Sequence, residues 1–167
     1  MSVDARVFRS WLYVACWMAF IFTMSTDIGS AAHTSQVIEP VLQWLRPNAT
    51  AEEADLVHFL IRKMAHLTEY AILATLIFRA LRKTAPQRFV RRPDRRLAPA
   101  LALAFALGLS AAYAAADEFH QRFIPGRESC VRDVLIDSSG ALGGLLILST
   151  ATLLARARRE RTELAPH

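Results

Sequence analysis

The chain has 167 residues, of which 53% are hydrophobic, and a formal net charge of +5. Its length suffices for one domain, but its apolar composition and positive mean hydropathy differ from those of ordinary soluble domains. Its two cysteines exclude a disulfide framework and a CxxC metal site. The composition therefore favours a small membrane protein.

Four apolar segments are long enough to cross a bilayer. In chain order they cover residues 7–24, 58–81, 97–116 and 131–155. A helix needs about 20 residues to span a hydrocarbon core of about 30 Å, so each segment can form one transmembrane helix. Helices are expected rather than strands, because that layer holds no water to satisfy backbone groups. We predict an all-α fold, a four-helix transmembrane bundle that forms a single domain over residues 1–167.

The first apolar segment also has features of a cleavable secretory signal. It follows Arg6 and Arg9, and small residues come after it at positions 29–32. We nevertheless expect an uncleaved anchor. Ser25 and Asp27 at its outer end join the polar residues of the later helices, which a discarded peptide could not do.

The loop after the first segment contains apolar residues at helical spacing between positions 37 and 45. We expect a short amphipathic helix on the outer membrane surface, with Trp44 as its anchor. Pro47 and Asn48 should end this helix.

A capping box precedes the second apolar segment. Thr50 is followed three residues later by Glu53, and this spacing lets each side chain bond to the backbone of the other. The second long helix is therefore expected to begin at Ala51, well before its apolar part.

The basic residues are unevenly distributed. Fourteen of the twenty Lys and Arg residues lie in three regions, 6–9, 79–96 and 156–161. In a four-span topology these regions share one side, which the positive-inside rule assigns to the cytoplasm. Both termini, the basic loop 82–96 and the tail 156–167 are then cytoplasmic in a multi-pass protein of the cytoplasmic membrane. Because the basic run has few aromatics, we expect membrane lipids and no nucleic acid as its partner.

The ionisable residues of three apolar segments fall at one depth. Lys63 lies 16 residues before Arg79, a rise of about 24 Å, and Asp137 lies 19 residues before Arg156, about 28 Å. Asp117 directly follows the third apolar segment. These groups therefore reach the extracytoplasmic edge of the hydrocarbon. Ionisable residues at such depth usually mark a functional site.

Within each helix the polar residues share one face, because they are three, four or seven positions apart. Such faces avoid lipid by turning toward each other, so we expect a polar pocket inside the bundle. Arg127, after the Pro125-Gly126 turn, could reach over this pocket. The faces comprise Lys63, His66, Glu69 and Tyr70, then Asp117, His120 and Gln121, and then Asp133, Asp137 and Gly140.

Gly140 and Gly144 form a GxxxG pair in the last apolar segment. Two glycines one turn apart leave a flat strip on a helix, and a neighbouring backbone can approach it closely. The last helix is therefore expected to pack tightly against another helix.

Three motifs occur in order: Lys63-x-x-His66-x-x-Glu69-Tyr70, Asp117-Glu118-x-His120-Gln121-x-x-x-Pro125-Gly126-Arg127, and Asp133-x-x-x-Asp137-x-x-Gly140. This arrangement resembles the VanZ-like family of bacterial integral membrane proteins, from about Ser25 to Gly144. The resemblance implies a four-helix protein of the bacterial cell envelope. The family's namesake is associated with resistance to the glycopeptide antibiotic teicoplanin. The resemblance implies no catalytic mechanism.

The polar pocket admits an enzymatic interpretation, with a lipid-linked or cell-wall anionic substrate. A group titrating near neutral pH suits proton transfer, and Arg suits an anion. No known phosphatase motif is matched. The catalytic candidates are His120, Asp117, Glu118 and Asp133, and the substrate-binding candidates are Lys63, His66, Glu69, Tyr70, Gln121, Arg127 and Asp137.

Three other interpretations stay open. The groups could form a structural ion-pair network, although such pairs exceed what packing requires. They could bind or transport an anionic lipid or a glycopeptide without chemistry. A metal site that includes His66 and His120 is chemically feasible. Because Lys63 disfavours a cation, we predict no metal, and the sequence identifies no cofactor.

Overall fold

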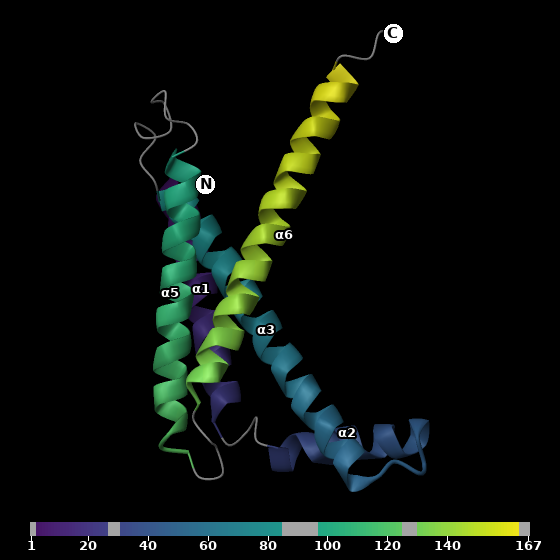
Figure 1. Cartoon of the computed structure of the whole chain (residues 1–167). Coiled ribbons are helices and arrows are strands. Elements are labelled where there is room, and N and C mark those ends of the chain that lie inside the picture. The colour runs from purple at the N-terminus through teal and green to yellow at the C-terminus, as the bar shows by residue number, and fades with distance from the viewer. Residues whose placement is uncertain (1–2, 27–30, 85–96, 125–129, 164–167) are drawn as a thin grey trace.

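The computed structural model describes residues 3–26, 31–84, 97–124 and 130–163, and these residues contain helices and no strand. Four of the helices in these residues are long and apolar enough to cross a membrane. The predicted all-α bundle with four candidate spans is confirmed. In chain order the helices are α1 (Val3–Ser25), α2 (Ala31–Leu45), α3 (Ala51–Thr84), α5 (Leu97–Gln121) and α6 (Val131–Glu163) (Figure 1).

The long helices extend beyond the apolar segments that predicted them. α3 begins at Ala51 rather than at residue 58, and α6 ends at Glu163 rather than at residue 155. An apolar run measures the part of a helix that suits the hydrocarbon, whereas the backbone hydrogen bonds continue into polar residues. The start of α3 at Ala51 agrees with the capping-box prediction, and α6 continues as a helix past its apolar segment.

The start of α3 confirms the predicted capping box. The Thr50 backbone N–H donates to Glu53 Oε2 at 3.1 Å, and the Glu53 backbone N–H donates to Thr50 Oγ1 at 3.3 Å. Two N–H groups at the start of the helix are thereby satisfied. This reciprocal pair accounts for a helix start at Ala51, seven residues before the apolar segment.

The short helix predicted in the first loop is α2, which lies transverse to the long helices beside the start of the third helix, α3 (Figure 1). It ends at Leu45, just before the turn at Pro47 and Asn48. Its Val41, Trp44 and Leu45 side chains are exposed, Trp44 to 81%. An exposed apolar face suits the membrane surface, and that location stays a prediction.

The four long helices alternate in direction (Figure 1). Trp11 Nε1 of α1 donates to Thr84 Oγ1 of α3 at 2.9 Å, and Lys83 Nζ donates to Ser10 Oγ at 2.8 Å. The start of α1 therefore lies beside the end of α3. We call this the terminal end of the bundle, since α6 also ends there, and we call the opposite end the α2 end.

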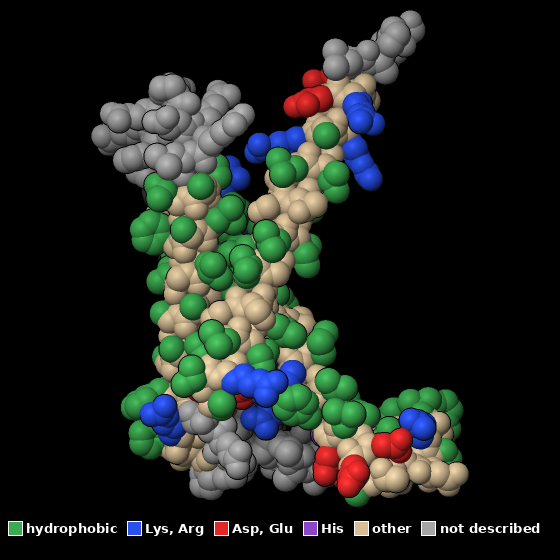
Figure 2. Space-filling model, in the orientation of Figure 1, with side chains coloured by type: hydrophobic (Ala, Val, Ile, Leu, Met, Phe, Trp, Pro, Cys, Tyr) green, Lys and Arg blue, Asp and Glu red, His purple; other side chains and the backbone are tan. Residues whose placement is uncertain are grey.

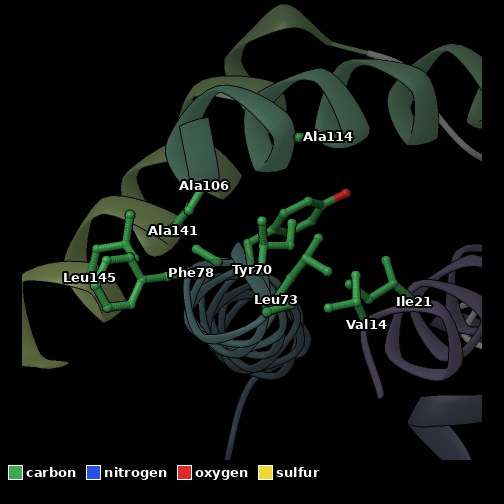
Figure 3. Close-up of a cluster of buried hydrophobic side chains, with 12 residues drawn as sticks. Val14, Ile21, Tyr70, Leu73, Phe78, Ala106, Ala114, Ala141 and Leu145 are labelled. Atoms are coloured by element: carbon green, nitrogen blue, oxygen red, sulfur yellow. The ribbon is translucent and has the colours of Figure 1, made fainter. Parts of the chain in front are cut away.

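α3 is the central helix and packs against α1, α5 and α6. Its Ile77 side chain is buried, and so are those of Tyr70 and Leu73, which face the other helices (Figure 3). α5 contributes the small buried residues Ala106 and Ala114, which allow it to lie close to α3. A compact core thus surrounds the middle of α3.

The predicted GxxxG pair forms the crossing of α3 and α6. A methyl group at Gly140 would lie 2.8 Å from Leu67 Cα, and one at Gly144 would lie 2.7 Å from Ala71 Cα. The two backbones therefore meet without intervening side chains. Beyond this crossing α6 diverges from the bundle, and residues 151–163 are exposed throughout (Figure 1).

The surface of the bundle is apolar between its two ends. In Figure 2 hydrophobic side chains cover the flanks of the helices, whereas charged side chains gather toward the α2 end and toward the end of α6. Phe105 and Ile147 are examples of large apolar side chains that are exposed. Such a surface is expected where lipid chains surround a protein.

Cys16 and Cys130 are free and exposed. Several other predictions fall outside the described residues. They concern Asp27, the turn at Pro125 and Gly126, Arg127, residues 85–96 of the basic loop and residues 164–167 of the tail.

Candidate functional site

Polar side chains from all four long helices lie together toward the α2 end. α1 contributes its last residue, and α3, α5 and α6 contribute the faces predicted from helical spacing. We call this set the polar layer. It consists of Ser25, Lys63, His66, Glu69, Tyr70, Asp117, Glu118, His120, Gln121, Asp133 and Asp137.

Two ionic contacts join α3 to α6. Lys63 Nζ donates to Asp133 Oδ1 at 2.6 Å, and the two side chains are 18% and 20% exposed. One turn further into the bundle, His66 Nδ1 lies 3.4 Å from Asp137 Oδ1. The polar faces of these two helices therefore meet, and they meet beside the glycine crossing at Gly140.

Asp117 joins α1 to α5. Ser25 Oγ donates to Asp117 Oδ2 at 2.7 Å, and Gln121 Nε2 donates to the same oxygen at 3.2 Å. The Asp117 side chain is buried, and its second oxygen, Oδ1, has no hydrogen-bond partner among the described residues. One carboxylate oxygen is thus saturated while the other is unused.

Glu118 supports the start of α6. Its Oε1 accepts a hydrogen bond of 2.6 Å from the backbone N–H of Cys130, the residue before the helix. A buried carboxylate in this position satisfies a donor that the helix itself cannot pair. Glu118 therefore has a structural contact, and its catalytic role stays a prediction.

Tyr70 and Tyr113 lie near each other, with ring centroids 6.4 Å apart, but their hydroxyls differ. Tyr113 OH donates to the Met18 carbonyl at 2.7 Å, so it joins α5 to α1. Tyr70 is fully buried, and its OH has no partner among the described residues. It is close enough to Asp117 and Asp137 to interact with both electrostatically.

The His120 ring stacks on Phe22, with centroids 4.6 Å apart, and its buried Nε2 has no partner in the described ranges. Among those residues no carboxylate is within ion-pair distance of the ring. The orienting carboxylate that a catalytic histidine needs is therefore not in contact with His120 here. Its role as nucleophile or base stays a prediction.

Arg62 is a residue that the sequence analysis overlooked. Its half-buried side chain has a buried Nε without a partner in the described part of the chain. Arg62 precedes Lys63 and lies one turn from His66, close enough to His66 to interact with it electrostatically. That spacing is a signal that could have identified it. The contact of Phe22 with His120 had no comparable signal.

The carboxylates and histidines do not form a metal centre where the structure describes them. No group of three or more His, Cys, Asp or Glu side chains in those ranges could hold a metal ion. The aspartates of the layer instead contact Lys63, His66, Ser25 and Gln121.

The sequence profile of the VanZ/LLP1 family matches residues 10–154, which include every residue of the polar layer. The chain belongs to the VanZ/LLP1 family. The resemblance inferred from the three motifs is thereby confirmed. No curated protein and no solved structure matches the chain. This VanZ/LLP1 protein is thus a helical membrane bundle that carries charged and polar groups at one depth.

Proposed function

We propose that this VanZ/LLP1 protein binds the phosphate-bearing headgroup of a lipid-linked cell-envelope intermediate at the extracytoplasmic edge of the bacterial cytoplasmic membrane. One observation carries the proposal. Every buried side-chain polar atom that lacks a partner in the described residues belongs to the polar layer or to its neighbour Arg62. A buried polar group without a partner costs about 1–3 kcal/mol, so their concentration at one place indicates a ligand.

The side of the membrane follows from the charges at the opposite end. Arg6, Arg9, Arg82 and Lys83 lie at the terminal end of α1 and α3, and the basic end of α6 points the same way (Figure 1). The positive-inside rule assigns that end to the cytoplasm. The polar layer then lies near the outer headgroups, within reach of a substrate anchored by acyl chains.

Arg62 is the described cation best suited to a phosphate. Lys63 was the sequence-based candidate, but Asp133 already takes up its charge at 2.6 Å. The Arg62 guanidinium has an unused buried donor, and guanidinium groups bind phosphate through paired hydrogen bonds. Arg127, outside the described residues, stays a second candidate.

The two contacts between α3 and α6 favour a competing function, a purely structural ion-pair network. Lys63 with Asp133 and His66 with Asp137 would fix how α3 and α6 cross. That function accounts for these four side chains. It does not account for the unpartnered atoms of Tyr70, Asp117 and His120, which the proposed ligand would satisfy.

Native mass spectrometry of the full chain in nanodiscs made from native membranes tests the proposal. Wild type should retain a phosphate-bearing lipid, and Arg62→Gln should lower its retention about tenfold, which corresponds to about 1.4 kcal/mol. Arg158→Gln is the matched control, because Arg158 is exposed near the terminal end of α6. Equal retention by wild type and a folded Arg62→Gln variant would refute the proposal.

A further inference from the structure

We infer that the group bound at Asp117 is a primary ammonium, so that the headgroup carries an ammonium beside its phosphate. The inference rests on the proposed function, because it takes Arg62 as the phosphate contact. It adds the chemical class of the ligand, and it assigns Asp117, Tyr70 and His120 to one half of that ligand.

The first argument is charge. In the polar layer Asp133 contacts Lys63 and Asp137 contacts His66. Among the described residues Asp117 hydrogen-bonds only to the neutral Ser25 hydroxyl and Gln121 amide, and His66 acts on it electrostatically without forming an ion pair. Asp117 is only 4% exposed, and no Lys, Arg or His among the described residues forms an ion pair with it. A buried charge is costly unless it is paired. A cationic ligand would supply the missing partner.

The second argument is the placement of unused acceptors. Asp117 Oδ2 already accepts two hydrogen bonds, so Oδ1 is the oxygen left for a ligand. In Figure 3 the Tyr70 side chain extends from α3 toward α5 near Ala114. Ala114 precedes Asp117 by one helical turn and lies on the same face of α5. His120 follows Asp117 by three residues. The unused atoms of Asp117 and His120 thus lie on neighbouring turns of α5, and the Tyr70 side chain approaches from α3.

A primary ammonium matches these atoms in both charge and number of donors. It has three N–H donors, and Asp117 Oδ1, Tyr70 Oη and His120 Nε2 are three atoms that can accept a hydrogen bond. A hydroxyl group has a single donor and no charge. A quaternary ammonium has a charge but no N–H donor and is normally held by aromatic faces. Neither alternative would satisfy the buried acceptors.

The test uses the full chain in nanodiscs of phosphatidylcholine that contain equal, small amounts of phosphatidylethanolamine and phosphatidylglycerol. Both probe lipids carry a phosphate, but only phosphatidylethanolamine carries a primary ammonium. Native mass spectrometry should show that wild type enriches phosphatidylethanolamine. Asp117→Asn should lower phosphatidylethanolamine binding about tenfold and leave phosphatidylglycerol unchanged, whereas Arg62→Gln should lower both. Ser110→Ala is the control on α5, because its buried hydroxyl donates only to the Ala106 carbonyl.

Tyr70→Phe provides a second variant in case Asp117→Asn does not fold. It removes only the unpartnered hydroxyl and should reduce the preference for phosphatidylethanolamine. Tyr113→Phe removes a hydroxyl that has a protein partner and should retain the preference. If wild type binds the two probe lipids equally and Arg62→Gln weakens both, the ammonium assignment is wrong and the proposed function stands. If Arg62→Gln changes neither, the proposed function itself fails.

Discussion

Ser25 provides the shorter of the two hydrogen bonds to Asp117, and it comes from a different helix. Ser25→Ala should therefore lower the free energy of unfolding by about 1–3 kcal/mol, since a buried carboxylate loses a donor that nothing else replaces. Unfolding in detergent measures this change. Thr23→Ala is the control, because the exposed Thr23 hydroxyl donates to its own helix. Equal stability of the two variants would contradict the assigned role.

The contact between Lys63 and Asp133 allows a double-mutant test of the structural network. Lys63→Met alone should cost about 2 kcal/mol, because it leaves Asp133 half-buried without its cation. Combining Lys63→Met with Asp133→Leu should recover most of that loss, since apolar packing replaces both charges. Additive losses in unfolding measurements would show that the two side chains are not coupled.

The residues of the polar layer could be predicted from spacing, but their partners could not. Helical phase placed Lys63 and His66 on one face, and the structure shows both facing α6. Which carboxylate each one meets depends on where α3 and α6 cross, and that is a property of two packed backbones. Arg62 lies four residues before His66, so spacing could have placed it near the layer, but only the structure shows that its buried Nε is unused.

At the scale of helices, the crossing of α3 and α6 determines the geometry of the layer. Gly140→Ala should destabilise the fold by about 1–3 kcal/mol, because its methyl group would overlap the Leu67 backbone and push the helices apart. Gly143→Ala is the matched control, because it is the same substitution in the same helix and its methyl group has no atom within 4 Å. That change should be neutral or slightly stabilising, as Ala favours helix over Gly. If the two variants had equal thermal stability, the close approach of α3 and α6 at Gly140 would not contribute to the stability of the fold.

The helices themselves were largely predictable, for two different physical reasons. Apolar length identified the four long helices, and the capping box of Thr50 and Glu53 identified the start of α3. The end of α6 was not predictable from hydropathy. Its residues 151–163 form helical hydrogen bonds without packing against the bundle, so no apolar pattern marks where the helix stops.

At the scale of the whole molecule, the proposed function requires that the polar layer lies toward the outer side of the membrane and the terminal end toward the cytoplasm. In a Cys16→Ala background, Cys130 should react with an impermeant maleimide added outside intact cells, because it is exposed near the α2 end. A cysteine introduced by Glu163→Cys, with Cys130→Ser, should react only after permeabilisation. Labelling in the reverse pattern would contradict the topology.

The central claim is that the unpartnered atoms of the polar layer belong to a ligand site. A structure of the full chain determined by electron cryomicroscopy in nanodiscs from native membranes tests it directly. The account predicts headgroup density that contacts the Arg62 guanidinium and Asp117 Oδ1. A layer with no bound group, in which Asp117 Oδ1 and the Tyr70 hydroxyl bond to protein side chains such as that of Arg127, would contradict it.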